Sequence, residues 1–437
     1  MSVHVLRHRR AACAVAVTAL IAVVLTGCGS SSKKAASNTT ATTTAAAGGM
    51  TKASGAVRGF DGTTITLGGM GIKGQLPGVV PGIQARIKRF NDTNEIPGIK
   101  LTLGDFADDK LDPAVALSEA RRLVTEVKAF ALVGDISSTN PGQYFVQQHV
   151  PYFGYAFDNT YCRNTPDASI WAFGFTGCLV PTTATVMPER QEAFFEYAKK
   201  TLGKDKPTFV IFSTDTTSGR TGLKFDAAEF AAAGFDVIGT KAIIPPPPVT
   251  DYTPYVQQLL TSNGGKAPDV IACYAAVDCL PVYAQLKANG FKGIYYNTLY
   301  ADVLLKALAG SVVGIEFANF SDSGIPALDQ MKADVKAVNS TDSIDIGIAA
   351  GYFSTSQFID ALKIVAKKGK DYITPENVRT AASTMTFEIK DLVGPTKYPE
   401  STVKPTPACS TLMLDDGGTA WKTISPYTCN TKSVPVK

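Results

Sequence analysis

Short apolar runs alternate with helical segments through most of this 437-residue chain. The runs have the length of β-strands and are rich in β-branched and aromatic residues, whereas the segments between them repeat apolar residues with helical spacing. Strands separated by helices form right-handed βαβ units around a parallel sheet. The sequence therefore predicts an α/β fold. The expected strands are residues 63–67, 99–106, 129–136 and 150–157 in the first half, and 208–215, 235–244, 268–276 and 293–300 in the second.

The pattern restarts after a less regular stretch, residues 158–180, so we expect two Rossmann-like lobes of similar size with parallel central sheets. Residues 301–384 are again helical in pattern, and residues 409–425 have the pattern of a β-hairpin that turns near Gly417. A hairpin after a run of helices indicates a multi-crossing hinge. We assign residues 57–180 and 301–385 to the first lobe, and residues 181–300 and 386–437 to the second.

Residues 1–27 have the layout of an export signal, because a basic segment precedes an uncharged run at residues 11–26. As a helix this run would rise about 24 Å, less than the roughly 30 Å hydrocarbon core of a bilayer. The sequence LTGC, which ends at Cys28, is similar to a bacterial lipobox and predicts lipidation of that thiol. The alternative is an ordinary signal with an unrelated cysteine. Residues 28–56 are a Ser/Thr/Ala-rich tether. We expect an exported protein, lipid-anchored on the outer face of the cytoplasmic membrane.

The charge of the chain is concentrated at its beginning. The formal net charge is +4, but the signal and the tether contain only basic charged residues, so the remaining body is close to neutral. Nucleic-acid binding needs a basic patch or stripe, and no nucleic-acid partner is expected. No later run is apolar for long enough to span a bilayer, so the lipid is the only membrane attachment that we expect.

Six of the eight cysteines fall into three couples that are close in sequence; the other two are Cys13 in the signal and Cys28. In an exported chain such couples favour disulfides between neighbours, although six cysteines allow fifteen pairings. A metal site is disfavoured because C-x-x-C spacing is missing and histidine is nearly absent. The expected disulfides are Cys162–Cys178, Cys273–Cys279 and Cys409–Cys429.

His149 is the single histidine outside the signal. A Ser-His-Asp triad would need it, and the chain contains no G-x-S-x-G elbow. Its place just before an expected strand is more typical of a surface or structural histidine. Hydrolase chemistry of this kind is therefore disfavoured, and we expect a binding protein, not an enzyme.

Gly69, Gly71 and Gly74 form a G-x-G-x-x-G pattern after the first expected strand, as in dinucleotide-binding folds. Such a site needs an acidic residue about twenty positions further on, whereas the next strand ends near Asp105. An exported compartment also offers no supply of NAD. We expect no cofactor, and we expect the glycines to form a loop that shapes the wall of a cleft.

The loop VGDISSTNPGQ leaves one expected strand and enters a helix with Pro141 at its first position. The hydroxyls of Ser137, Ser138 and Thr139, together with nearby backbone N–H groups, suit an anion such as a carboxylate. Simple capping of the helix explains the same residues equally well.

Seven stretches follow one another in an order that is specific, although each is weak alone. In chain order they read FADDKLDPAVALSEARRLV, ALVGDISSTNPG, VPYFGYAFDN, TFVIFSTDTTSGRTG, TDYTPYVQQL, PDVIACYAA and LKANGFKGIYYN. Together, and after a lipobox, they resemble the leucine/isoleucine/valine-binding family of type I periplasmic binding proteins. The resemblance spans Ile65 to about Ser425.

The resemblance implies a two-lobed receptor that closes on a small-molecule solute and presents it to an ATP-driven permease. We therefore expect an extracytoplasmic substrate-binding protein of an ABC importer that takes an amino-acid-like or carboxylate solute. The permease and its ATPase are the implied partners, and we expect a monomer. An alternative is a sensor of the same fold, and a less favoured one is an exported α/β enzyme.

The resemblance also implies which residues line the cleft. The family's serine-rich loop for the ligand carboxylate corresponds to Ser138, with Ser137 and Thr139 beside it. The next strand end supplies backbone and hydroxyl contacts, here at Phe157 and Asp158. The positions implied in the second lobe are Ser218, Tyr274 and Tyr300.

This sequence departs from the family at two of those positions. Ser218 stands where the family has a tyrosine, and Leu299 or Tyr300 stands where it has the glutamate that binds the ligand's ammonium group. A buried ammonium without a charge partner would cost several kcal/mol. A standard branched-chain amino acid is therefore disfavoured: either Asp158 replaces the missing acid, or the ligand has no ammonium group.

Overall fold

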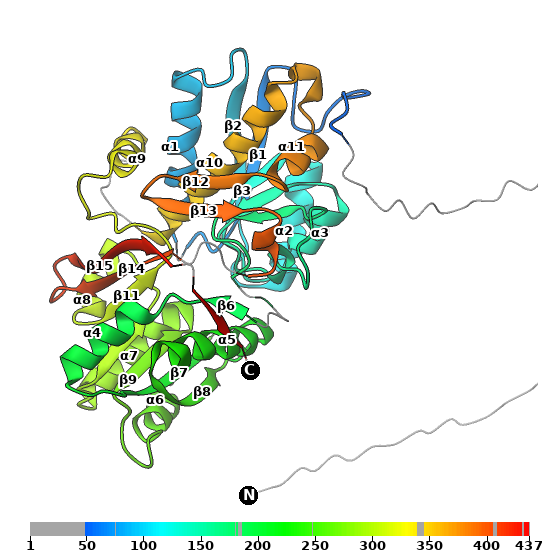
Figure 1. Cartoon of the computed structure of the whole chain (residues 1–437). Coiled ribbons are helices and arrows are strands. Elements are labelled where there is room, and N and C mark those ends of the chain that lie inside the picture. Colours follow the sequence, from blue (N-terminus) through cyan, green and yellow to red (C-terminus); the bar gives the residue numbers. More distant parts are fainter. Residues whose placement is uncertain are drawn as a thin grey trace, which may run out of the picture. The chain divides into compact units, whose positions relative to one another are not determined.

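A parallel sheet in the order β2-β1-β3-β4-β5 forms the first lobe in the computed structural model (Figure 1). The structure describes residues 49–74, 76–179, 181, 186–246, 248–338, 345–404, 409–430 and 432–436. The predicted α/β fold is confirmed. The strands are β1 (Thr64–Gly71), β2 (Lys100–Asp108), β3 (Ala131–Asp135), β4 (Tyr152–Gly154) and β5 (Ala172–Gly174).

Two of the three glycines that we expected in a loop continue β1. The strand runs to Gly71, which pairs with Asp108 of β2. A Cβ atom on Gly69 would lie 2.5 Å from the Phe106 side chain and 2.8 Å from the carbonyl oxygen of Val133. These glycines are therefore needed for close packing within the sheet, and Gly74 follows in a turn.

Helices cover the first sheet on both faces. Helices α1 (Val79–Asp92) and α10 (Ile346–Ala366) pack against each other and against the sheet, and α2 (Pro113–Thr125) and α3 (Gly142–Gln147) pack beside one another. Helices α1 and α10 approach closely because a Cβ on Gly351 would lie 2.2 Å from the carbonyl oxygen of Val79. Almost every residue of α10 is buried, so this helix is the centre of the first lobe.

The second lobe contains a seven-stranded sheet in the order β15-β14-β11-β10-β9-β7-β8. The side chains of its strand at residues 208–214 alternate between the two faces of the sheet. Phe209 and Ile211 join the apolar cluster under α4 and α5, whereas Val210 and Phe212 join the core that includes α6 and α7. The parallel strands are β7 (Thr208–Thr214), β8 (Asp236–Ile244), β9 (Val270–Tyr274), β10 (Ile294–Asn297) and β11 (Val312–Ile315). The helices are α4 (Glu192–Leu202), α5 (Thr217–Ala233), α6 (Thr253–Leu260), α7 (Cys279–Ala288) and α8 (Leu305–Leu308).

The chain passes between the lobes at places other than the expected ones. β11 lies within residues 301–384, which we expected to be helical and in the first lobe, yet it pairs with β10 and β14 in the second sheet. Its four residues are too few to show a strand period. The chain then returns to the first lobe with α9 (Pro326–Lys336), α10 and α11 (Pro375–Ala382).

A second difference concerns residues 386–404, which we expected in the second lobe. The hairpin of β12 (Thr386–Ile389) and β13 (Val393–Lys397) is followed by Tyr398, whose hydroxyl donates to the carbonyl of Gly174 at 2.8 Å. Tyr398 also packs edge-on against Phe173 of β5. This hairpin is therefore tied to the first lobe, and the chain returns to the second lobe after it.

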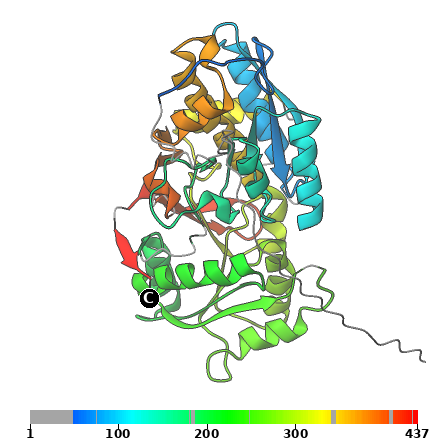
Figure 2. The ribbon, with the colours of Figure 1, turned by 90° about the vertical axis from the view of Figure 1, so that its right-hand side faces the viewer.

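The predicted C-terminal hairpin is present as β14 (Cys409–Asp415) and β15 (Trp421–Cys429), paired antiparallel. A last strand, β16 (Ser433–Pro435), pairs with β6 (Val186–Pro188), which lies on the segment that enters the second lobe. Val434, Met187 and Phe225 of α5 form a small apolar cluster there. Figure 2 shows β16 beside the second lobe, so the end of the chain closes over a hinge segment.

All three predicted disulfides are confirmed: Cys162–Cys178, Cys273–Cys279 and Cys409–Cys429. The first joins the segments after β4 and β5, the second fixes the loop between β9 and α7, and the third joins the open ends of β14 and β15. Each cross-link closes a loop of at most 20 residues.

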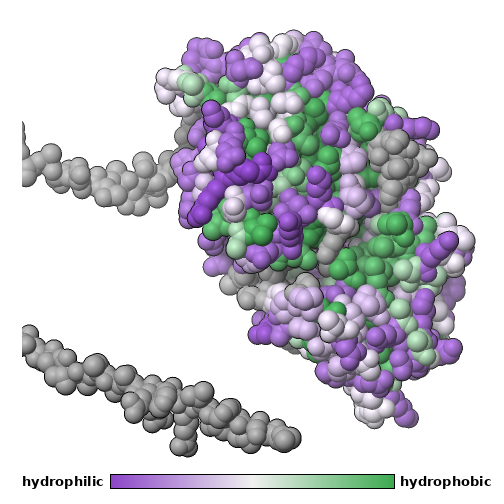
Figure 3. Space-filling model, turned by 180° about the vertical axis from the view of Figure 1, so that it is seen from behind, coloured by the Kyte–Doolittle hydropathy of each residue, from purple (hydrophilic) through white to green (hydrophobic). Residues whose placement is uncertain are grey.

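The end of the expected tether is attached to the first lobe. Thr51 exchanges two hydrogen bonds with the side chain of Asn377, and the backbone N–H of Ala53 donates to the carbonyl of Asp371 at 2.7 Å. Cys28 and the signal lie outside the described residues. No helix in the described ranges combines the length and apolar character needed to cross a bilayer. The face seen in Figure 3 is a mixture of hydrophilic and hydrophobic areas.

Candidate functional site

The serine-rich loop follows β3 at the carboxyl edge of the first sheet, as predicted. Two of its hydroxyls already have an anionic partner, because Ser137 donates to the Asp109 carboxylate at 2.5 Å and Thr139 donates to the same oxygen at 3.2 Å. Ser138 is exposed. Helix α3 begins at Gly142, one residue later than expected, with Pro141 as its cap residue. Of the three predicted residues, Ser138 is therefore the one that the loop presents to solvent.

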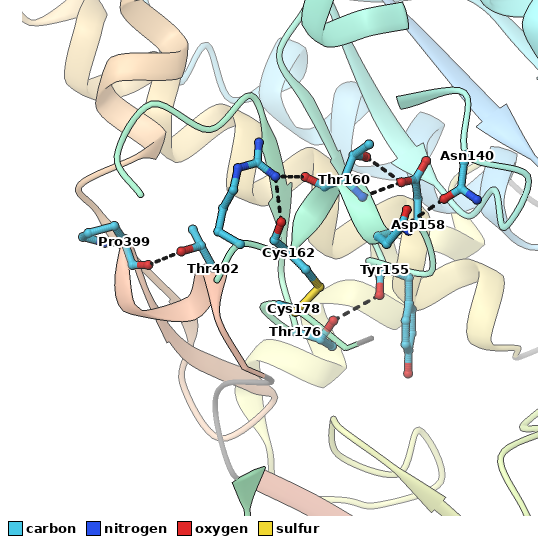
Figure 4. The surroundings of a disulfide bond; sticks show 11 residues. Asn140, Tyr155, Asp158, Thr160, Cys162, Thr176, Cys178, Pro399 and Thr402 are labelled. Atoms are coloured by element: carbon cyan, nitrogen blue, oxygen red, sulfur yellow. Dashed lines mark hydrogen bonds between the residues drawn. A yellow bond between two sulfur atoms is a disulfide. The ribbon is translucent and has the colours of Figure 1, made fainter. Parts of the chain in front are cut away.

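Asp158, which we expected to contact the ligand, is enclosed by its own chain. Its carboxylate accepts hydrogen bonds from the backbone and hydroxyl of Thr160, both at 2.6 Å (Figure 4). It also accepts the backbone N–H of Gly142 at 3.2 Å. The side chain is 1% exposed, and burial raises the pKa of Asp158. It caps the short helix at Asn159–Tyr161, so it positions the loop and does not replace the missing ammonium-binding acid by direct contact.

Phe157 is half-buried and stacks on Tyr155, with ring centroids 4.7 Å apart. The Tyr155 ring points away from the Cys162–Cys178 disulfide in Figure 4. Its carbonyl accepts a hydrogen bond from the Thr176 hydroxyl at 3.1 Å. The segment that carries the two rings is therefore held in place by the hydrogen bond from Thr176 to Tyr155 and by the bonds of Asp158.

In the second lobe, Tyr274 ends β9 and is half-buried. Its ring stacks near Tyr296 of β10 with centroids 6.3 Å apart, and its neighbour Cys273 is cross-linked to Cys279. Ser218 belongs to α5, and its side chain lies outside the described residues. Of the predicted second-lobe residues, Tyr274 is the one with an aromatic face at a strand end.

Tyr300 is a core residue, contrary to the expectation. It is 1% exposed, its hydroxyl donates to Asn319 at 2.9 Å, and it accepts the backbone N–H of Phe320. Its ring packs edge-on against Trp421 of β15. Tyr300 thus joins the end of β10 to the hinge and contributes no free group to a ligand.

The sequence reasoning missed a cluster of buried and half-buried charged residues near Tyr274 and Tyr296. Arg190 donates to both oxygens of Glu229 at 3.2 and 3.3 Å, and to Glu316 at 3.3 Å. Glu229 and Asp226 lie one helical turn apart on α5. We define these four residues as the acidic hinge cluster: Arg190, Asp226, Glu229 and Glu316.

Burial governs the protonation of this cluster. Burial raises the pKa of Asp226 to about 8; the charge of Glu229 adds to the rise and Arg190 opposes it. Burial also raises the pKa of Glu229, again against Arg190. Glu316 is the more accessible acid, with 21% of its side chain exposed against none for Glu229. A charged residue directly after the apolar run Val312–Ile315 was the available signal for Glu316.

Glu316 also connects the lobes. The hydroxyl of Tyr155, in the first lobe, donates to its Oε2 atom at 2.6 Å. Burial raises the pKa of Tyr155, and the charge of Glu316 adds to the rise, so the phenol remains a donor. In the residues that the structure describes, no three His, Cys, Asp or Glu side chains are arranged to hold a metal ion.

Comparisons with known proteins identify what the chain is similar to. A family model described as periplasmic binding protein matches residues 62–418. A search of curated proteins gives no match. Similar solved structures have low sequence identity, and they show the fold alone.

A fatty acid ABC transporter substrate-binding protein from Thermomonospora curvata aligns with a TM-score of 0.66 at 16% identity, over 88% of this chain and 96% of that one. A branched chain amino acid ABC transporter from Thermus thermophilus with bound valine gives 0.63 at 14%, over 84% and 97%. An R. palustris solute binding protein in complex with 4-hydroxybenzoate gives 0.63 at 16%, over 84% and 98%.

Proposed function

The chain belongs to the periplasmic binding protein family, and from this membership we propose that it is the extracytoplasmic solute-binding component of an ABC importer. It binds a small solute between its two lobes and releases the solute, chemically unchanged, to a permease that is driven by an ATPase. It acts as a monomer, because one chain supplies both lobes.

The observation that best supports this proposal is the hydrogen bond between Tyr155 and Glu316. It brings a first-lobe segment next to the serine-rich loop into contact with the end of a second-lobe strand. The proposed solute contacts are Ser138 and Phe157 from the first lobe and Tyr274 and Glu316 from the second. Asp109 and Asp158 hold the first-lobe loops in position.

The proposal includes a lipid anchor at Cys28, supported by the lipobox-like LTGC sequence and the tether that follows it. Expression with a radiolabelled or alkyne-tagged fatty acid tests it: the wild type should be labelled and found with membranes. The Cys28→Ser variant should be unlabelled and released. A labelled Cys28→Ser variant would contradict the assignment.

A thermal-unfolding screen tests solute binding itself. A ligand at about a hundred times its dissociation constant adds roughly 2.7 kcal/mol to the free energy of unfolding. The screen should contain amines, amino acids, carboxylates, benzoates and fatty acids, applied to protein shown by native mass spectrometry to be free of copurified ligand. We expect a clear upward shift within one class. No shift with any class would contradict a solute-binding role.

A further inference from the structure

We propose that the solute is an organic cation, such as an aliphatic or aromatic amine, and not an acid. This inference rests on the proposed function, because it takes the space between the lobes as the binding site. It differs from the sequence expectation, which favours an amino-acid-like or carboxylate solute bound through the serine-rich loop.

The first-lobe side of the site is unfavourable for a carboxylate. Behind the serine-rich loop lie three buried acids, Asp109, Asp135 and Asp158, each at most 2% exposed. The hydroxyls of Ser137 and Thr139 already donate to Asp109. A carboxylate ligand at this loop would therefore find those donors occupied.

Asp135 adds an independent observation. Its Oδ2 atom accepts from the Tyr161 hydroxyl at 2.6 Å, whereas its buried Oδ1 atom has no hydrogen-bond partner among the described residues. A buried acceptor without a donor is costly. At this position the first lobe lacks a hydrogen-bond donor and does not lack an acceptor.

The second-lobe side has more acids than cations; burial raises the pKa of Asp226 and of Glu229, and Glu316 is the accessible acid. In the acidic hinge cluster a single cation, Arg190, faces Asp226, Glu229 and Glu316, and Arg190 is shared between the two glutamates. Glu316 uses one oxygen for Arg190 and the other for Tyr155. Each carboxylate oxygen can accept more than one hydrogen bond, so Glu316 retains acceptor capacity on its exposed side.

Aromatic rings stand next to these acids. Tyr155 stacks on Phe157 in the first lobe, and Tyr274 stacks near Tyr296 in the second. An aromatic face attracts a cation that lies within about 6 Å of the ring centre, and the attraction is stronger when the site is shielded from water. Glu316, with aromatic rings near it in both lobes, favours an ammonium group over a carboxylate.

Titration calorimetry with matched compounds tests the inference on the full chain. The probes are diamines, amino acids and diacids of three to six carbons, together with benzylamine and benzoate. We expect the tightest ligand to be an amine, with at least tenfold higher affinity than its matched acid. If an acid or a zwitterion binds most tightly, the inference is wrong and the solute-binding role stands. If no probe of any charge binds, both are contradicted.

Three variants test whether Glu316 is responsible for the preference for amines. Glu316→Gln keeps the size and the acceptor oxygen but removes the charge, and it should lower the affinity for the best amine at least tenfold. Glu316→Asp keeps the charge and should retain most of the preference for amines over acids. Glu376→Gln removes an exposed charge on α11 and should change nothing. Unchanged amine binding in a folded Glu316→Gln variant would overturn the role of this acid.

Discussion

The hydroxyl of Tyr155 donates a hydrogen bond of 2.6 Å to Glu316. Tyr155 follows β4 in the first lobe, and Glu316 follows β11 in the second. The same carboxylate accepts from Arg190, which is held by Glu229 of α5. Contact between the lobes is therefore linked directly to the acidic hinge cluster.

Removing this bond should weaken binding. Tyr155→Phe keeps the ring and its stacking on Phe157 but deletes the donor, and hydrogen bonds to charged groups contribute about 1.5–3 kcal/mol. We expect a loss of solute affinity of about tenfold or more in calorimetry. Tyr283→Phe is the matched control, because it deletes a 2.9 Å bond to Ala309 within the second lobe. Equal losses of affinity in the two variants would contradict a special role for Tyr155.

The raised pKa of Asp226 predicts how stability depends on pH. An acid with a raised pKa stabilises the folded state while it is protonated. This contribution is fully present below the ordinary value of 3.8 and is lost as the pH rises through about 8. Between pH 4 and 9 the wild type should therefore lose stability, and the loss should be larger than that of Asp226→Asn by on the order of 1–3 kcal/mol. The variant has no carboxyl group at this position to ionise.

Denaturant unfolding across this pH range measures the difference. The charged or titratable groups around Asp226 are Glu229 on its own helix, Arg190 before α4, Glu316 after β11, Tyr274 at the end of β9 and Tyr296 in β10. Asp205→Asn, at a 96% exposed side chain, should follow the wild type. Parallel curves for wild type and Asp226→Asn would contradict an Asp226 that stays protonated in the folded state.

Affinity should also depend on the charge of Asp226. A cationic solute favours its ionised form, so binding releases a proton, and affinity should rise as the pH increases from 6 to 9. Calorimetry in two buffers with different ionisation enthalpies counts the protons released. Affinity that falls over this range would contradict a cationic ligand next to Asp226.

Two of the disulfides should differ in what they support: one contributes more to stability and the other more to solute binding. Cross-links that close longer loops stabilise more in the chain-entropy account, about 2 kcal/mol for a six-residue loop and about 3 kcal/mol for a twenty-residue loop. Replacing Cys409 and Cys429 by alanine should therefore cost more stability than replacing Cys273 and Cys279. The latter pair should cost more affinity, because it fixes the loop that begins with Tyr274. Thermal unfolding of both double variants tests which disulfide contributes more to stability, and calorimetry tests which contributes more to affinity. If either ranking is reversed, the corresponding argument is contradicted.

The contact between α1 and α10 should not tolerate a side chain. Gly351→Ala would place a Cβ 2.2 Å from the carbonyl oxygen of Val79, and overpacking a core typically costs 1–3 kcal/mol. The control, Gly74→Ala, adds a Cβ with nothing within 4 Å. We expect a clear loss of thermal stability in the first variant and little change in the second. Equal stability of the two variants would show that the helices can separate without cost.

The architecture could be predicted from the sequence because long strand and helix patterns carry it. Strands such as Thr208–Thr214 show their apolar character without any tertiary information, and neighbouring cysteines in an exported chain indicated the pairing that is found. Four-residue β11 does not show such a pattern. The lobe boundaries were misplaced because they depend on strands of that length.

The site was predicted less well, for a physical reason. Family correspondence placed Ser138 and Tyr274 at strand ends, but it could not show that Asp109 occupies the hydroxyls beside Ser138 or that Tyr300 is buried against Trp421. Glu316 and Arg190 are 126 residues apart in sequence and meet only in the folded chain. The burial of a polar group and its hydrogen-bond partners depend on the tertiary structure. They decide which residues can contact a solute.

Hydrogen–deuterium exchange of the full chain, with and without its tightest ligand at saturation, tests the central claim most directly. A solute held between the lobes should slow exchange on both sides at once: residues 136–142 and 155–158 in the first lobe, and residues 274–279 and 314–318 in the second. Protection that is confined to one lobe, or is absent from all four segments, would contradict binding between the lobes.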